Sequence, residues 1–181
     1  MLTHFQRRKL TRYFNCIDQD GKGFFVHDDV LDIARRMAQA RNVSEGSDDF
    51  QLIADGVMII WDNARIYSYN QDPNRVTQAD WLIHESIVLA TKEIRESYME
   101  KVTRDVFDLA DLGGKGYMTE QDYADLMTAF GVEPELSHWA FFQVKSKNKD
   151  TISRNEFIRI VEDFHISEDR SAPGNYLFGP Y

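Results

Sequence analysis

The chain has little cysteine and proline, and it lacks any long apolar run. Its single cysteine, Cys16, excludes an internal disulfide bond and favours a reducing compartment, so we expect a cytoplasmic protein. No segment approaches the roughly 20 consecutive apolar residues that a membrane-spanning helix needs, and the basic residues near the N-terminus are not followed by the apolar run of a secretion signal. We therefore expect no membrane partner.

Positive charge is in the minority. The 181 residues include 21 Lys and Arg but 30 Asp and Glu, which gives a net charge of −9. Proteins that bind nucleic acid place clustered Lys and Arg on the phosphates, so the composition argues against a nucleic-acid partner. Acidity is compatible with cation binding, and equally with a surface that only keeps the protein soluble. The 43% hydrophobic content is enough for the core of a compact protein of one or two domains, and we expect a monomer.

The familiar catalytic motifs are also missing. The chain has no phosphate-binding glycine loop, no nucleophile elbow and no HExxH zinc motif, and Cys16 with a distant histidine is too little to indicate a thiol enzyme. We therefore favour a protein that is not an enzyme. An enzyme built on a metal-free version of a binding scaffold stays an alternative, because such an enzyme need not contain a recognisable catalytic motif.

What the chain does contain is a fourfold internal repeat. Turn-rich stretches of twelve residues lie between helix-like segments at 18–29, 69–80, 111–122 and 145–156, and each ends in an acid. They align on a hydrophobic eighth position, which is Phe25, Val76, Met118 or Ile152. A chance match would have to recur in phase four times, so the repeat predicts four helix–loop–helix calcium modules, or EF-hands.

Apolar residues at helical spacing flank the loops. Leu10, Tyr13, Phe14 and Ile17 follow the i, i+3, i+4, i+7 pattern and predict a helix that runs into the first loop. Similar patterns lie before and after the other loops, and the helix that leaves the second loop is expected to continue to Ile94. The predicted fold is therefore all-α, with eight helices.

The modules are expected to form two packed pairs. Residues 1–98 would hold the first two loops and residues 99–170 the last two, and the join has no glycine or proline that would make it a flexible linker. Within each pair, the eighth positions should form a short antiparallel β contact, Phe25 with Val76 and Met118 with Ile152.

Residues 171–181 form a tail with large apolar and aromatic side chains, among them Leu177 and Phe178, in a segment that proline and glycine keep from being helical. Left in water, these side chains would form an exposed apolar patch. We therefore expect the tail to pack across the helices as a lid, over either a filled core or a cavity.

The first loop is the best candidate for a metal site. Calcium takes six to eight oxygens, and this loop supplies the carboxylates of Asp18, Asp20 and Asp29 and the carbonyl of Phe24. Lys22 stands at the fifth position, where it offers no acceptor and brings a positive charge. Asp at the last position is shorter than the usual Glu, which favours magnesium or weakly bound calcium. We predict at most one weak calcium or magnesium site.

The second and third loops match less well. The third keeps Asp111 and Asp122 as weaker candidates but has Gly113 and Lys115 where two oxygen ligands are expected. The second begins with Tyr69 and has proline at its fifth position, so it cannot form the usual cage.

The fourth loop places Lys145, Lys147 and Lys149 at its first, third and fifth positions. Three ammonium groups would repel a divalent cation. We hypothesise that one of them takes the ion's place by reaching Glu156; the alternative is that all three are solvated.

The acids at the loop ends have a second explanation. In three loops the acid follows a Ser or Thr by three residues, which fits a helix-capping box and needs no metal. The first loop has Val26 at that place, so Asp29 has the better claim to be a metal ligand. The three capping pairs are Thr77 with Asp80, Thr119 with Asp122, and Ser153 with Glu156.

With these features, the chain resembles the sarcoplasmic calcium-binding protein family and its bacterial relatives of the calerythrin type. The resemblance rests on residues 10–21, 76–82 and 172–180, and it covers nearly the whole chain. It implies a compact, cytosolic, helical protein that serves as a calcium buffer or sensor, with some loops inactive. Compared residue by residue, the family's metal-ligand positions are matched only at Asp18, Asp20, Phe24 and Asp29, with a partial match at Asp111 and Asp122.

A related branch, the calcium-regulated photoproteins and luciferin-binding proteins, uses the same fold to enclose a hydrophobic ligand. Aromatic residues make up 13% of this chain, and two pairs of Trp and His stand close in sequence. A hydrophobic small molecule is therefore the alternative partner; the competing interpretation is that these aromatics are ordinary core residues. The candidate cavity residues are Trp61, Trp81, His84, His138 and Trp139.

Overall fold

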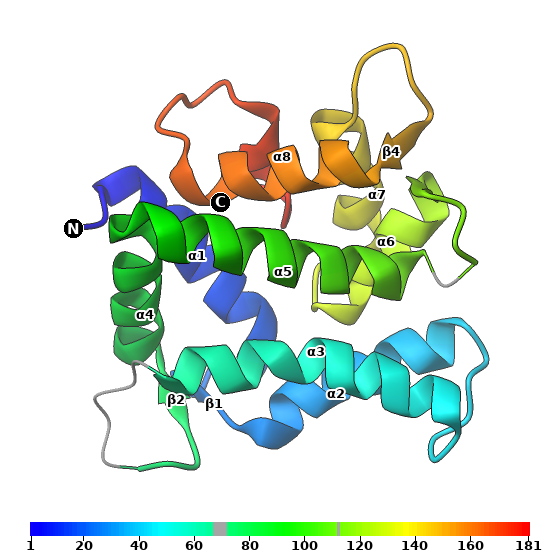
Figure 1. The fold of residues 1–181 in the computed structure, drawn as a ribbon, viewed down its shortest axis with the longest axis horizontal. Coiled ribbons are helices and arrows are strands. Elements are labelled where there is room, and N and C mark those ends of the chain that lie inside the picture. The colour runs from blue at the N-terminus through cyan, green and yellow to red at the C-terminus, as the bar shows by residue number, and fades with distance from the viewer. Residues whose placement is uncertain (67–71, 112) are drawn as a thin grey trace.

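A computed structural model describes residues 1–66, 72–111 and 113–181 (Figure 1). Within these residues the chain forms eight α-helices and a short 3₁₀ helix, η1, which confirms the all-α prediction. None of the described helices is both long enough and apolar enough to cross a membrane. The helices are α1 (His4–Ile17), α2 (His27–Ala40), α3 (Asp48–Ile66), α4 (Gln78–Ala90), α5 (Lys92–Ala110), α6 (Glu120–Ala129), α7 (Pro134–Val144), α8 (Arg154–Ile166) and η1 (Pro173–Tyr176).

Side chains cap the starts of the helices that leave the loops, because the first backbone N–H groups of a helix have no partner within it. The carboxylates of Asp80, Asp122 and Glu156 accept hydrogen bonds from the capping residues Thr77, Thr119 and Ser153, as the spacing predicted. Asp29 does the same at α2, where its Oδ2 accepts from the Val26 N–H at 2.7 Å. The expectation that Asp29 has less of a capping role is therefore wrong, because the backbone of Val26 supplies the donor that its side chain lacks.

Two short β contacts join the loops in pairs. β1 (Phe24–Phe25) runs antiparallel to β2 (Val76–Thr77), with Phe25 opposite Val76. β3 (Tyr117–Thr119) runs antiparallel to β4 (Thr151–Ser153), with Met118 opposite Ile152. Both predicted pairs of eighth positions are confirmed, and their four side chains are fully buried.

Helix α5 lies between α3 on one side and α8 on the other, and packs against both (Figure 1). It is separate from α4, because Thr91 adopts an extended conformation and the chain changes direction there. Ile94 therefore belongs to α5, and the prediction of one helix continuing to Ile94 is wrong. The predicted boundary at residues 98 and 99 falls inside α5, so a continuous helix joins the two pairs of loops.

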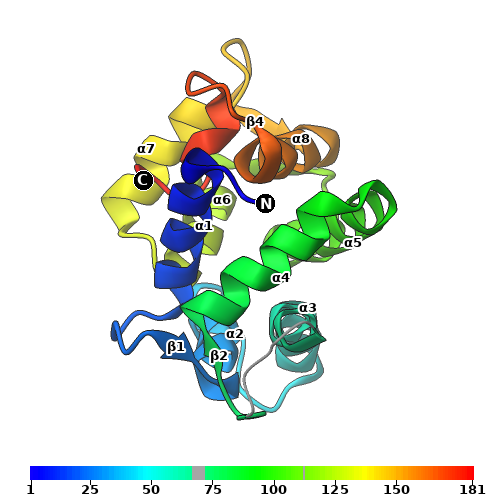
Figure 2. The same ribbon diagram turned by 90° about the vertical axis from the view of Figure 1, so that its left-hand side faces the viewer.

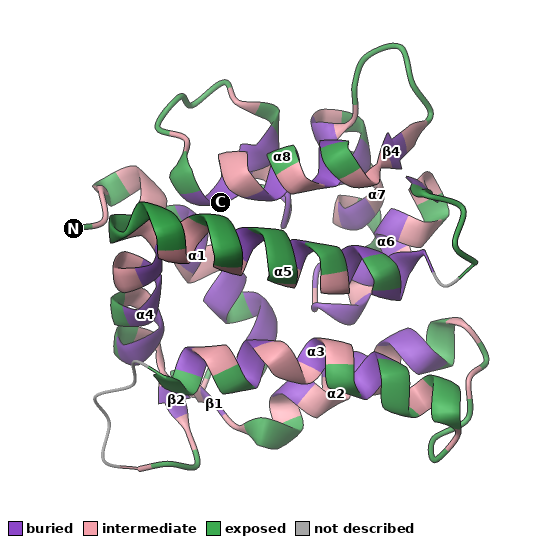
Figure 3. Cartoon of the chain, viewed as in Figure 1, coloured by how far each residue is buried: buried purple, intermediate pink, exposed green. Residues whose placement is uncertain are grey.

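The buried core runs through both pairs of loops, and the buried residues lie on the inward sides of the helices (Figure 3). Helix α1 packs against α4 and α8, which brings its apolar face into contact with elements from both halves (Figure 2). Polar groups are buried with the apolar ones. Lys9 is completely buried, and its Nζ donates to the carbonyl oxygens of Asp163 and Ser167 and to Oδ1 of Asn175.

The tail lies against α7 and α8. A side chain at Gly174 would place its Cβ 2.5 Å from the carbonyl oxygen of Ile160, so glycine permits this close approach. Leu177 and Phe178 follow η1 and are buried, with 2% and 5% of their surfaces exposed. The Tyr123 hydroxyl donates to the Leu177 carbonyl at 2.8 Å, which fixes the backbone of the tail at this point.

Candidate metal loops and a buried cavity

The first loop contains its own cation. The ammonium of Lys22 lies 3.0 Å from Oδ1 of Asp20 and 2.8 Å from Oδ2 of Asp29, between two of the predicted metal ligands. Desolvation lowers the pKa of Lys22, but hydrogen bonds to Asp29 and Asp20 outweigh it and raise the pKa above its ordinary value. The hydrogen bond from Lys22 also lowers the pKa of Asp20. Lys22 is therefore charged at neutral pH and neutralises part of the acid cluster.

The other ligands of this loop are arranged as in a folded loop. Oδ1 and Oδ2 of Asp18 accept from the backbone N–H groups of Lys22 at 3.1 Å and Gly23 at 2.8 Å. Gly23 has a φ of +84°, which glycine adopts without strain. Phe24 lies in β1 opposite Thr77. The loop thus keeps its turn through backbone donors to Asp18 and the ammonium of Lys22.

The third loop repeats this arrangement. Asp111 accepts from the N–H groups of Lys115 at 2.8 Å and Gly116 at 2.6 Å. Nζ of Lys115 donates to Oδ2 of Asp122 at 2.7 Å. Desolvation raises the pKa of Asp122, but the hydrogen bond from Lys115 and those from Thr119 bring it below its ordinary value. The weaker metal candidates Asp111 and Asp122 are therefore both engaged within the protein.

The fourth loop supports the hypothesis that a lysine replaces the ion. Nζ of Lys149 donates to Oε1 of Glu156 at 2.9 Å, and Ser146 donates to the same oxygen. Desolvation raises the pKa of Glu156, but its hydrogen bonds, from Ser153 and Lys149 first, hold it at about 2. Lys145 instead donates to the Lys149 carbonyl. Lysine at the fifth position thus contacts the acid at the last position in three of the four loops.

The second loop is described from residue 72 onward, so the prediction for Tyr69 lies outside the described residues. Oδ1 of Asp72 accepts from the Asn74 N–H at 2.9 Å, and its Oδ2 lies 3.3 Å from Nε of Arg75. Asp80 caps α4. The carboxylate oxygens of Asp72 and Asp80, which could have faced an ion, therefore interact with groups of the protein itself.

These contacts decide how well each loop fits a divalent cation. Among the residues that the structure describes, no group of three or more His, Cys, Asp or Glu side chains is placed to hold a metal ion. In the first loop Lys22 bridges Asp20 and Asp29, and it must leave before both can ligate an ion. In the third and fourth loops the fifth-position lysine also contacts the last acid, and fewer acids stand at the ligand positions: Asp111 and Asp122 in the third and Glu156 in the fourth.

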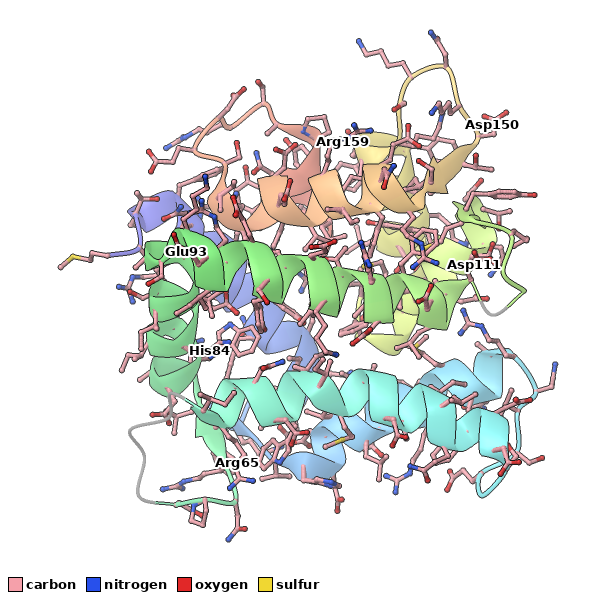
Figure 4. All side chains as sticks on the ribbon, in the orientation of Figure 1. Arg65, His84, Glu93, Asp111, Asp150 and Arg159 are labelled. Atoms are coloured by element: carbon pink, nitrogen blue, oxygen red, sulfur yellow. The ribbon has the colours of Figure 1, made fainter. Side chains whose placement is uncertain are left out.

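The predicted cavity residues lie in two places. Trp61 and Trp81 are buried and both contact the ring of Phe25 edge-on. His84 lies on the inner side of α4, with its Nε2 3.5 Å from the Tyr98 hydroxyl of α5 (Figure 4).

The second Trp and His pair lies on α7, near the surface. Trp139 is 38% exposed and contacts Tyr176, and Nδ1 of His138 lies 2.9 Å from Oε1 of Glu120. The prediction that the two pairs line one cavity therefore needs correction, because α7 presents this pair to the tail and to α6.

An apolar cavity of about 40 Å³ does lie between α1, α5, α6, α8 and the tail. Its walls include Tyr13, Tyr98, Thr103, Leu177 and Phe178, and none of the predicted cavity residues. A buried water needs roughly 10–15 Å³ of such volume, so the cavity has room for a few water molecules. Pockets for drug-sized ligands measure roughly 300–1,000 Å³, so a ligand of that size requires the tail to move.

A buried acid lies beside this cavity. Glu85 is completely buried, and neither carboxylate oxygen has a hydrogen-bond partner in the part of the chain that the structure describes. Burial raises its pKa to about 8, so Glu85 is mainly protonated at neutral pH. Its Oε2 lies 4.0 Å from Nε2 of His165, a residue of the cavity wall.

His165 is neutral as well. Its Nδ1 lies 2.7 Å from the Val161 carbonyl and must carry the proton to donate there, which leaves Nε2 facing Glu85 as an acceptor. Burial lowers the pKa of His165 to about 4. Sequence reasoning did not single out Glu85 or His165. Glu85 follows the buried Trp81 by four residues and precedes the buried Val88 by three, and this helical spacing could have indicated its burial.

The comparisons with known proteins agree with this geometry. The sequence is 22% identical to calerythrin from Saccharopolyspora erythraea over 168 residues, which are 92% of this chain and 95% of that protein. The structure resembles coelenterazine-binding protein from Renilla muelleri with a TM-score of 0.77 at 19% identity, covering 99% of this chain and 100% of that one. It also resembles a sarcoplasmic calcium-binding protein from amphioxus with a TM-score of 0.71 at 18% identity, covering 100% of both chains. No family model matches the chain.

Paired helix–loop–helix modules with β contacts between the loops define the fold: the chain has the EF-hand fold. The similarity to calerythrin extends over nearly the full length of both chains, and it agrees with the predicted resemblance to the sarcoplasmic calcium-binding protein and calerythrin-type family.

Proposed function

We propose that this protein is a calcium-buffer or sensor-like EF-hand protein whose loops are largely degenerate, with at most one weak calcium or magnesium site, in the first loop. The observation that carries the proposal is the ammonium of Lys22 within hydrogen-bond distance of Asp20 and Asp29. The fifth-position lysines of the third and fourth loops make the same contact with the acid at the last position. The protein thereby provides internally the positive charge that an ion would bring.

Lys22 weakens cation binding without abolishing it. The side chains of Lys22 and Asp29 are only partly buried, and ion pairs at such sites stabilise proteins by roughly 0–1 kcal/mol. A divalent cation can therefore displace the ammonium into solvent. Once the ammonium has left, the site would offer the carboxylates of Asp18, Asp20 and Asp29 and the carbonyl of Phe24, with water completing the coordination.

Calorimetric titration with calcium and with magnesium tests this proposal. We expect no more than one site, weakly occupied, and Asp18→Ala should abolish it. Asp150→Ala is the matched control, because Asp150 is a fully exposed acid in the fourth loop, and it should leave the titration unchanged. Two or more tight sites in the wild-type protein would contradict the proposal.

A second candidate function is the binding of a hydrophobic small molecule. It is favoured by the cavity behind Leu177 and Phe178, where Thr103 Oγ1 is buried without a hydrogen-bond partner and could orient a ligand. Coelenterazine-binding protein, whose fold is similar, is named for such a ligand. Wild-type protein should bind the dye anilinonaphthalene sulfonate weakly, and Phe178→Ala, which enlarges the cavity, should bind it more tightly. Equal binding by both proteins would speak against this candidate.

We further propose that the protein acts as a cytoplasmic monomer with neither nucleic acid nor membrane as a partner. The support is compositional: one cysteine, a net charge of −9 and the absence of a long apolar run.

A further inference from the structure

Helix α1 is positively charged in an acidic protein. Residues 1–17 contain four of the chain's 21 Lys and Arg residues and none of its 30 Asp and Glu residues. Lys9 is directed into the core, whereas Arg7 and Arg8 are exposed and Arg12 is partly exposed. The positive charge of α1 therefore lies mainly on its outer side.

These arginines line a surface groove of about 400 Å³. Arg8 and Arg12, four residues apart, and the neighbouring Arg7 form one wall together with His4. The opposite side is formed by the end of the tail, which lies beside α1. Among the residues that the structure describes, no Asp or Glu side chain lines the groove.

Main-chain oxygens of the tail hold two of the arginines in place. Nη2 of Arg8 donates to the main-chain oxygen of Tyr181 at 2.9 Å, and Nε of Arg12 donates to the carbonyl of Phe178 at 3.0 Å. A guanidinium has five N–H donors, so each arginine keeps donors for a further partner. The Tyr181 ring also lies beneath the guanidinium of Arg8, with 5.5 Å between Cζ and the ring centroid.

The lack of acidic partners distinguishes this cluster from other arginines of the chain. In the part of the chain that the structure describes, neither Arg7 nor Arg8 nor Arg12 lies within ion-pair distance of a carboxylate side chain. Other arginines are paired: Arg35 with Asp32, Arg104 with Glu100, and Arg154 with Asp108. Arg12, which a neutral carbonyl holds in place and no carboxylate side chain occupies, has a guanidinium fork of the kind that binds phosphate oxygens in a bidentate manner.

We propose that this groove binds a small, soluble, phosphate-bearing anion. Arg7, Arg8 and Arg12 contact the phosphate oxygens, and the Tyr181 ring covers the adjoining organic part. The volume of about 400 Å³ falls within the range of small-molecule sites. The site lies outside the four loops and the buried cavity, so it is separate from the function proposed above.

Calorimetric titration of the full chain with inorganic pyrophosphate tests the proposal. We expect Arg7→Gln to weaken binding about tenfold, because one charge-assisted interaction is lost. The Arg7 side chain makes no hydrogen bond or ion pair with any residue that the structure describes, so its replacement should leave the melting temperature unchanged. Arg159→Gln is the matched control: Arg159 is also an exposed, unpaired helical arginine, and it lies on α8 (Figure 4). This control should bind pyrophosphate as the wild type does.

Three results would overturn the proposal. The first is the absence of any heat of binding when wild-type protein is titrated with millimolar pyrophosphate at low salt. Arg159→Gln could weaken binding as much as Arg7→Gln, which would show a general effect of surface charge. Binding to phosphatidylserine vesicles, but not to phosphatidylcholine vesicles or pyrophosphate, would identify the groove as a membrane contact instead.

Discussion

Replacing Glu85 by glutamine should make the protein increasingly more stable than the wild type as the pH rises from 4.5 to 7. Glu85 is completely buried without a hydrogen-bond partner, and burial raises its pKa from 4.5 to about 8. Glutamine has nearly the same shape but cannot ionise. The two proteins therefore differ in how their folding is linked to protons.

The sign of the effect follows from the two pKa values. Below pH 4.5, Glu85 is protonated in both the folded and the unfolded protein, and its contribution to stability is fully present. As the pH rises, the unfolded protein releases the proton first, so the free energy of unfolding falls until the pH reaches about 8. Each pH unit corresponds to about 1.4 kcal/mol, so the wild type should lose about 3 kcal/mol relative to Glu85→Gln between pH 4.5 and 7.

Urea unfolding at several pH values between 4.5 and 7 measures this difference. A constant loss of stability from inserting the amide does not affect the test. What is compared is how the difference in free energy of unfolding between the two proteins changes with pH. Burial also lowers the pKa of His84 and of His165 to about 4, and the stability that they lose as the pH falls from 6.5 is common to both proteins. Glu93→Gln, at an exposed position of α5, is the control and should show no slope (Figure 4).

A difference in free energy of unfolding between wild type and Glu85→Gln that does not change with pH would refute the reasoning, because it would mean that Glu85 ionises normally in the folded protein. A slope of the opposite sign would mean that Glu85 is a carboxylate paired with a protonated His165. Either result would show that Glu85 is not a neutral acid beside the cavity.

Two further predictions concern the first loop and the tail. Lys22→Asp removes the internal ammonium and adds a carboxylate at the fifth position, so calorimetry should show calcium binding that is tighter by about tenfold or more; unchanged affinity would show that Lys22 does not compete with the ion. Phe178→Ala removes a ring that is 95% buried and stacks on Tyr13 at 4.3 Å, so urea unfolding should show a loss of about 3–5 kcal/mol. A loss below about 1 kcal/mol, together with rapid hydrogen exchange throughout the tail, would show that the tail is not held on the core.

The repeat in the sequence was sufficient to predict the β contacts. The eighth positions of the loops recur in phase, and the pairs Phe25 with Val76 and Met118 with Ile152 follow from that spacing. The break between α4 and α5 was not predictable in the same way. Thr91 is extended there without a glycine or proline nearby, so tertiary packing decides the conformation.

The candidate site was predicted only in part, because spacing places residues along the chain but does not show how far a side chain reaches. The sequence indicated that Lys22 would repel an ion, but not that its ammonium would contact Asp29, seven residues further on. For the same reason, the sequence grouped Trp81 and Trp139 as candidate cavity residues but did not show that Trp81 is buried whereas α7 exposes Trp139. Glu85 was missed because an acid on a helix is ordinarily solvated.

The most direct test of the central claim, that lysines of this protein take the place of bound ions, is thermal unfolding in EDTA and in calcium. Loops that are held by Lys22, Lys115 and Lys149 should fold without metal, so we expect the two melting temperatures to agree within roughly 5 °C. A melting temperature lower by tens of degrees in EDTA would show that folding depends on bound calcium, and would contradict the claim.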